Sequence, residues 1–451
     1  METDLGIDLG VKERYATTMT VFMNILFILI TGIWFVRFFI EMGMSKEHRI
    51  CRFFQGSAEY KGESLTKKDI RQVLLFALAI RLLVYFAGIF IYMVHSHVTV
   101  FSWNDFLNLW NRSDAQHYLD LAEKGYAACT EVTEWSGREE HLFLVFFPLY
   151  PWFIRLVHLF VNSYVVAAFV VSILSFCIGC AFFYGAVKEE YGASIAEKSL
   201  ILLMLYPFSF FFGGIMTESL FFCLMSAGFF YIHRHKWLGV GLIGILASLC
   251  RIQGVILLGV GMVEFFVYYQ PLRMLREKQF KSFLKHFFTE AVWLFLIPIG
   301  NLIYLGLNYQ ITGNAFQFTV YQKNHWYHTT TWFTNCVAEI VRYFSGQGSD
   351  TMLLIWYPEL VLFLVAAVLL LYSLRTQPLK YSAYLLVYTL INYSVTFLIS
   401  GGRYMLNALP LFFFTAALLD KHKMLYKLLC FALALLYGIY FTAFITGGAI
   451  Y

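Results

Sequence analysis

The chain has 451 residues, of which 60% are hydrophobic and 14% are charged, and its mean hydropathy is +0.66. Soluble domains carry about 25% charged residues, so this composition predicts an integral membrane protein. The formal net charge of +5 is small for this length and lies in short basic segments, which argues against nucleic-acid binding. Long unbroken apolar runs favour helices over a transmembrane β-barrel, whose strands alternate over about 10 residues.

Apolar runs in chain order predict about twelve transmembrane helices. They fall near residues 21–40, 72–98, 162–187, 199–213, 217–232, 237–250, 252–268, 289–310, 353–374, 380–400, 402–419 and 424–447. No small-residue cleavage site follows the first run, so we interpret it as an uncleaved span. Runs such as 199–213 and 237–250 are shorter than the roughly 20 residues of a perpendicular span, which predicts helices that end at an internal cavity.

The loop charges predict the orientation, because Lys and Arg concentrate on the cytoplasmic side. The loop 41–71 and the segment 269–288 are basic, whereas 99–141 is rich in Asp and Glu. We therefore expect 41–71 and 269–288 to lie inside, and the two long segments 99–161 and 311–352 to lie outside. Loops of this length are usually functional or disordered, and both are rich in aromatic residues. Within the first, residues 142–160 are expected to form an interfacial or re-entrant helix.

The eight cysteines are scattered and do not form a disulfide framework. Cys177 and Cys180 lie inside an apolar run without further metal ligands, which is typical of packing thiols. A disulfide between Cys129 and Cys336, both in expected outer loops, is left open by the sequence.

A candidate catalytic carboxylate lies in the first outer loop. The stretch from Trp110 to Tyr126, WNRSDAQHYLDLAEKGY, has apolar positions at helical spacing. In a helix over 113–124, Asp114, His117 and Tyr118 share one face. The alternative for Asp114 is a structural one, in which it caps the N-terminus of this helix. His117 is equally consistent with a packing role.

Three further ionisable residues lie at span ends on the expected outer side: Glu218, Arg251 and Arg403. Each is costly beside lipid unless paired, so together with Asp114 they indicate a functional cavity. Two guanidinium groups and apolar helices suit an amphiphile with an anionic phosphate and an isoprenoid tail. The alternative for each arginine is that it extends its charged end to the membrane interface. The alternative for Glu218 is that its charge stabilises the N-terminus of a helix. No glycine-rich nucleotide-binding motif is present.

Six stretches in order carry a resemblance to a known family. They are WNRSDAQHYLDLAEKGY (110–126), FFPLYP (146–151), LYPFSFFFGGIMTESLF (205–221), ASLCRIQG (247–254), TGNAFQFTVYQ (312–322, with Trp326 after it) and RYMLNALPLF (403–412). The set resembles the PIG-V type mannosyltransferases, which are multi-spanning GT-C glycosyltransferases. The chain departs from the family pattern at Ser113, where a Trp is usual, and within residues 250–253. The resemblance covers roughly residues 103–420.

The resemblance implies a GT-C fold and an inverting transfer of a sugar, usually mannose, from a polyprenyl or dolichyl phosphate to an acceptor hydroxyl. It maps the catalytic base onto Asp114. The residues themselves agree with this chemistry: a carboxylate accepts the acceptor proton, and Arg251 and Arg403 bind the phosphate of the donor. The remaining candidates for binding sugar or acceptor are Arg112, His117, Tyr118, Glu218, Gln322, Lys323, His325 and Trp326. For the last four, a structural aromatic loop is the alternative.

We therefore expect an all-α membrane protein with an N-terminal span and cytoplasmic linker (1–71) and a GT-C glycosyltransferase domain (72–451). Its outer loop 99–161 would be catalytic, and 311–352 would contact acceptor or donor. Expected partners are a polyprenyl- or dolichyl-phosphate sugar, a glycolipid or cell-envelope acceptor and the lipid bilayer, with no nucleic acid. No cofactor is expected, and a divalent metal is left open.

The expected location is multi-pass in a membrane, with the active site on the outer or lumenal face. A glycosylation sequon at residues 111–113, beside the expected base, favours a bacterial plasma membrane over the endoplasmic reticulum. The alternative function is a multi-spanning lipid or glycolipid transporter or flippase, because spans with buried charges are also typical of transporters.

Overall fold

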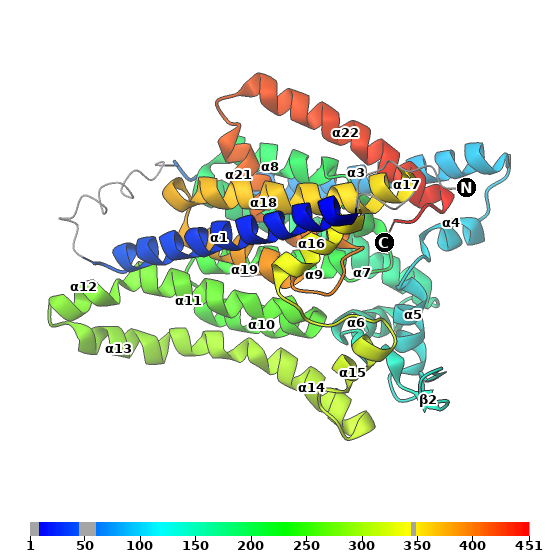
Figure 1. Cartoon of the computed structure of the whole chain (residues 1–451), viewed down its shortest axis with the longest axis horizontal. Helices are drawn as coiled ribbons and strands as arrows, with labels where there is room; N and C mark the ends of the chain where they lie inside the picture. The colour runs from blue at the N-terminus through cyan, green and yellow to red at the C-terminus, as the bar shows by residue number, and fades with distance from the viewer. Residues whose placement is uncertain (1–8, 45–59, 344–348, 451) are drawn as a thin grey trace.

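The computed structural model describes residues 9–44, 60–343 and 349–450. Figure 1 shows long helices packed side by side with their axes nearly aligned. Within the described residues, seven helical segments are long and apolar enough to cross a membrane, so the chain is an integral membrane protein, as predicted. These segments are Glu13–Glu41, Lys67–Ser96, Tyr164–Tyr191, Ile252–Arg276, Phe280–Thr312, Met352–Thr376 and Lys423–Thr446.

Each of the twelve apolar runs contains helix, and five of these helices are too short to span. The membrane-length segments contain α1 (Leu9–Glu41), α3 (Lys67–Ser96), α7 (Tyr164–Tyr191), α11 (Ile256–Tyr269), α14 (Pro298–Thr312), α18 (Tyr357–Thr376) and α22 (Lys423–Thr446), of which α11 and α14 reach that length only together with adjoining helical turns. The short ones are α8 (Ala193–Leu205), α9 (Glu218–His233), α10 (Trp237–Cys250), α19 (Leu379–Tyr393) and α21 (Pro410–Leu418). Single 3₁₀ or π turns occupy Leu142–Val145, Ser209–Gly213, Ile252–Val255, Ala291–Leu296, Met352–Trp356 and Met405–Asn407.

The segments expected outside and those expected inside lie at opposite ends of the bundle (Figure 1). One end carries α12 (Pro271–Arg276) and α13 (Phe280–Thr289). The other carries α4 (Trp103–Trp110), α5 (Ala115–Lys124), α6 (Leu149–His158), α15 (Gln317–Asn324), α16 (Phe333–Tyr343) and α17 (Ser349–Thr351). A two-stranded antiparallel hairpin, β1 (Glu131–Val132) and β2 (Glu139–Glu140), also lies there and adds a small non-helical element to the expected all-α fold. Residues 45–59 of the expected inner loop lie outside the described residues.

The helix expected over 142–160 is divided. A 3₁₀ turn at Leu142–Val145 precedes α6, which begins after Pro148, because proline fixes the backbone at a helix start but cannot donate within it. The helix expected over 113–124 begins at Ala115. Ser113 has a left-handed backbone with φ 52°, which turns the chain just before this helix.

An irregular stretch, residues 206–217, connects α8 to α9 inside the protein. Its buried backbone carbonyls need partners, since irregular backbone is tolerated at membrane depth only when it is covered by protein. Side chains from α3, α7 and α9 supply them. Arg81 donates to the carbonyls of Ser209 and Phe210, and Tyr85 donates to the carbonyl of Gly213. Ser172 donates to the carbonyl of Gly214, and Ser219 donates to that of Phe212. These bonds fix the backbone that leads into Thr217 and Glu218.

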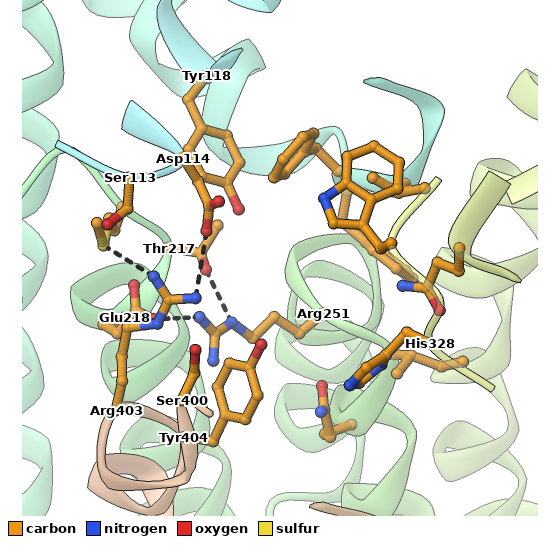
Figure 2. A pocket seen from close by; sticks show the side chains of 18 of the residues that line it. Ser113, Asp114, Tyr118, Thr217, Glu218, Arg251, His328, Ser400, Arg403 and Tyr404 are labelled. Atoms are coloured by element: carbon orange, nitrogen blue, oxygen red, sulfur yellow. Dashed lines mark hydrogen bonds and ion pairs between the residues drawn. The ribbon is translucent and has the colours of Figure 1, made fainter. Parts of the chain in front are cut away.

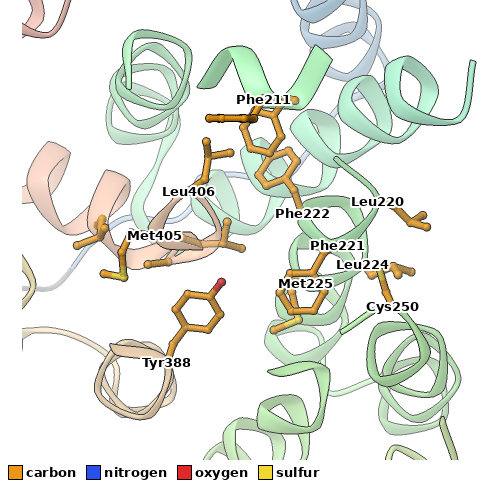
Figure 3. Packing of buried hydrophobic residues seen from close by; sticks show 14 of the residues in the cluster. Phe211, Leu220, Phe221, Phe222, Leu224, Met225, Cys250, Tyr388, Met405 and Leu406 are labelled. Atoms are coloured by element: carbon orange, nitrogen blue, oxygen red, sulfur yellow. The ribbon is translucent and has the colours of Figure 1, made fainter. Parts of the chain in front are cut away.

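Buried apolar side chains of α9 form the centre of the core. Phe221, Phe222 and Met225 are fully buried, and α9 packs along α7 and α10. Figure 3 shows these side chains facing Met405 and Leu406 from the turn after α20 (Gly401–Tyr404). The close packing of these side chains fixes the start of α9 relative to α20.

Candidate functional site

A cavity of about 590 Å³ lies where the short helices α9, α10 and α20 meet the loop that carries α5. This position agrees with the expectation that the short apolar helices end at an internal cavity. Its ionisable and polar lining includes Asp114, Glu218, Arg251 and Arg403. Figure 2 shows these four side chains directed toward one another, although they come from segments far apart in the sequence.

Asp114 occupies the N-cap position of α5, but its side chain makes no capping hydrogen bond. Instead its Oδ2 lies 3.2 Å from Nη2 of Arg403. The Asp114 side chain is 34% exposed, whereas that of Arg403 is only 8% exposed. The structure therefore favours the cavity over the capping alternative for this carboxylate.

Glu218 joins the two arginines. It is the first residue of α9, and its Oε1 accepts a hydrogen bond from Nη2 of Arg251 at 2.5 Å. Nε of Arg403 lies 3.3 Å from the same oxygen but is poorly aligned for a hydrogen bond, so that contact is electrostatic. The other carboxylate oxygen of Glu218 is buried without a hydrogen-bond partner. A carboxylate with one unsatisfied oxygen at a cavity is suited to accept a hydrogen bond from a ligand.

Arg251 lies at the C-terminal end of α10, where the helix stops and the backbone becomes extended. Its Nε donates to the hydroxyl of Thr217 at 2.8 Å, and its guanidinium lies over the ring of Tyr404. With Arg403 it gives the cavity two positive charges, which Asp114 and Glu218 balance. These fixed contacts are inconsistent with freely snorkelling arginines.

Tyr118 lines the cavity from the second turn of α5. Burial, together with the neighbouring Asp114 carboxylate, raises the pKa of the Tyr118 hydroxyl well above its usual range. Tyr118 therefore keeps its proton at neutral pH and can donate a hydrogen bond but not act as a base.

The other wall of the cavity is largely aromatic. Gln322, His325 and Trp326 line it from α15 and the turn after it, and all three are among the candidates from the sequence. His328 lies across the cavity from Arg403 (Figure 2). Its Nε2 lies 2.9 Å from the carbonyl oxygen of Phe397, and burial lowers the pKa of its imidazole. Amide, imidazole and indole groups of this kind can hydrogen-bond and stack against a sugar ring.

Three residues proposed from the sequence do not line the cavity. Arg112 donates to the carbonyls of Leu109 and Ile445, so it fixes the end of α22 instead. His117 packs against the rings of Phe143 and Phe146, which is the structural alternative. Lys323 is exposed.

Sequence reasoning missed several lining residues, namely Ser113, Met216, Thr217, Gln253, His328, Phe397, Ser400 and Tyr404. Thr217 and Tyr404 are adjacent in sequence to Glu218 and Arg403, and that adjacency was the available signal. His328 lies in the expected outer segment 311–352, but no residue pattern singled it out. Phe397 lies beyond the end of α19, in the part of the run 380–400 where the sequence predicted helix.

Within the described ranges, no group of three or more His, Cys, Asp or Glu side chains could hold a metal ion. The seven described cysteines are all free thiols, and this includes Cys129 and Cys336. Cys177 and Cys180 are buried in α7, which agrees with a packing role.

Comparison with known protein families finds no matching family, and comparison with curated proteins finds no matching sequence. Among solved structures, the chain is similar to the crystal structure of ArnT from Cupriavidus metallidurans bound to undecaprenyl phosphate. The sequence identity is 14% and the TM-score is 0.46. The match covers 77% of this chain and 60% of the ArnT chain.

Proposed function

We propose that the protein is an inverting GT-C glycosyltransferase. It moves a sugar, which we expect to be mannose, from a polyprenyl or dolichyl phosphate to a hydroxyl of a lipid-linked or cell-envelope acceptor. The observation that carries the proposal is the convergence of two buried arginines and two carboxylates on one cavity with an aromatic wall. All four of these residues lie in the sequence motifs that resemble PIG-V type enzymes.

In the proposed reaction, the acceptor oxygen attacks the anomeric carbon from the face opposite the phosphate. The bond between that carbon and the phosphate oxygen breaks, and its electron pair leaves with the lipid phosphate. Asp114 accepts the proton of the acceptor hydroxyl, a contribution of about 10²- to 10⁴-fold in rate. Arg251 and Arg403 stabilise the negative charge that grows on the leaving phosphate.

The ion pair between Arg403 and Asp114 implies an order of events. A phosphate that binds Arg403 competes with the Asp114 carboxylate for the same N–H groups, and phosphate oxygens match the guanidinium fork well. Donor binding therefore frees Asp114 to accept a proton. We propose that the donor binds first and that Asp114 becomes an effective base only in the loaded site.

The aromatic wall, which includes Gln322, His325 and Trp326, would bind the acceptor sugar or the transferred sugar. It has no fixed cation, because Lys323 faces away from the cavity. The proposed location is the outer face of a bacterial plasma membrane. Asp114 and Tyr118 of the acidic loop 99–141 line the cavity, and Figure 1 shows this loop at the end of the bundle expected outside.

The direct test incubates purified protein with polyprenyl-phosphate mannose or polyprenyl-phosphate glucose and a panel of lipid acceptors, with products identified by mass spectrometry. The proposal predicts a glycosylated acceptor and free polyprenyl phosphate in equal amounts. Movement of the intact donor lipid across a vesicle bilayer, without any glycosylated product, would instead support the transporter alternative.

A further inference from the structure

A buried carboxyl group outside the cavity contacts the backbone that carries Arg403. Glu359 lies in the first turn of α18 and is 1% exposed. Its Oε1 accepts a hydrogen bond from the backbone N–H of Gly401 at 2.6 Å. Within the described residues, no Lys, Arg or His forms an ion pair with Glu359, and its Oε2 has no hydrogen-bond partner.

This placement is unfavourable by itself. A carboxyl group removed from water without a cationic partner costs several kcal/mol, and such groups in membrane proteins usually mark a functional requirement. The contact with Gly401 is correspondingly tight, because a Cβ atom at Gly401 would lie 1.7 Å from Oε2 of Glu359. A side chain at position 401 would displace the Glu359 carboxyl group, so glycine permits this contact.

The rest of α20 is also held through its backbone. Tyr206 donates its hydroxyl to the carbonyl of Gly402 at 2.8 Å, and Tyr388 donates to the carbonyl of Tyr404 at 2.9 Å. The two bonds flank Arg403, and the bond from Gly401 to Glu359 fixes the start of the same helical turn. With four residues, α20 has little internal hydrogen bonding, so these outside contacts determine where the Arg403 side chain points.

We infer that Glu359 is a positioning residue: it fixes α20 so that the guanidinium of Arg403 lies between Asp114 and Glu218, ready for a donor phosphate. The inference rests on the proposed function, since the role of Arg403 as a phosphate ligand is part of that proposal. Glu359 acts through the backbone at the start of α20 and does not line the cavity.

The test measures the dissociation constant of a polyprenyl phosphate for the full-length protein in lipid nanodiscs. Glu359→Gln keeps an oxygen acceptor for Gly401 and should bind within about threefold of wild type. Glu359→Met keeps the length but removes the acceptor, and affinity should fall about tenfold or more because Arg403 is displaced. Tyr393→Phe is the matched control, since the Tyr393 hydroxyl donates to the backbone carbonyl of Glu359 rather than to α20. It should change the melting temperature but not the affinity.

A second variant keeps the test decisive if Glu359→Met does not fold. Gly401→Ala leaves Glu359 intact but forces it and α20 apart, and it should weaken binding by about tenfold as well. If a folded variant, Glu359→Met or Gly401→Ala, binds with wild-type affinity, Glu359 is not a positioning residue. That result would leave the proposed function unaffected. Failure of the wild-type protein to bind the polyprenyl phosphate would overturn the proposed function itself.

Discussion

Arg403 contacts both carboxylates of the cavity: its Nη2 lies 3.2 Å from Oδ2 of Asp114, and its Nε lies 3.3 Å from Oε1 of Glu218. Asp114 is the N-cap residue of the outer helix α5, whereas Arg403 lies on α20, nearly 300 residues later. The unloaded site is therefore electrically balanced. An anionic ligand that binds this guanidinium competes with the two carboxylates, and the predictions below follow from that competition.

Replacing Arg251 or Arg403 with Lys should weaken donor binding while the fold survives. Lysine keeps the charge but loses the planar fork, and a hydrogen bond between charged groups contributes about 1.5–3 kcal/mol, so affinity should fall at least about tenfold. Binding of polyprenyl phosphate measured in nanodiscs checks this.

Arg112→Lys is the control for these variants, because Arg112 bonds to Leu109 and Ile445 outside the cavity. It should lower stability and leave affinity unchanged. Normal affinity in both cavity variants would show that the donor phosphate binds elsewhere.

Glu218→Gln should destabilise the unloaded protein. Removing a buried negative charge leaves the two arginines repelling each other, and breaking a buried ion pair typically costs about 3–5 kcal/mol. Bound polyprenyl phosphate supplies the missing charge, so it should raise the melting temperature of the variant more than that of wild type.

Glu264→Gln is a matched control for that experiment. Glu264 pairs with Lys380 in another charged cluster and does not line the cavity. This variant should lose stability without gaining extra protection from the lipid. Equal protection of both variants would contradict the role of Glu218 in balancing the phosphate site.

Cysteines placed at Glu134 and at Lys61 should react with an impermeant thiol reagent from opposite sides of the membrane. Both positions are exposed, and they lie in the segments expected outside and inside respectively. The reaction is measured in sealed vesicles with a cysteine-free background. Labelling of both positions from one side would refute the predicted topology.

Much of the framework could be predicted because membranes impose simple rules. Each apolar run contains a helix. Glu218, Arg251 and Arg403 at the ends of runs indicated a functional cavity, because a charged side chain beside lipid is costly unless it is paired. The GT-C assignment stays a prediction that rests on the motifs.

Side-chain directions in the outer loops could not be predicted. Arg112 and Asp114 are close in sequence, but Arg112 bonds to Ile445 outside the cavity, whereas Asp114 pairs with Arg403 inside it. The left-handed backbone of Ser113 turns the chain between them. Glu359 was missed for a related reason. Its function depends on a tertiary contact with Gly401, and no local pattern marks that contact.

The most direct test of the account is Asp114→Asn, assayed for both turnover and donor affinity. Turnover should fall by about 100-fold or more, because the amide cannot accept the proton of the acceptor hydroxyl. From the sequence alone, donor affinity is expected to stay unchanged, but the contact with Arg403 alters that expectation. Because Asp114 is one-third exposed, its pairing with Arg403 contributes about 1 kcal/mol, so its loss should tighten polyprenyl phosphate binding by up to about fivefold.

Asp120→Asn is the matched control, since Asp120 lies on the same helix but pairs with Lys124 away from the cavity. It should be nearly neutral in both assays. The account predicts a slow Asp114→Asn enzyme that holds its lipid phosphate more tightly. Wild-type turnover in Asp114→Asn would contradict it, because the cavity would then lack its proposed base.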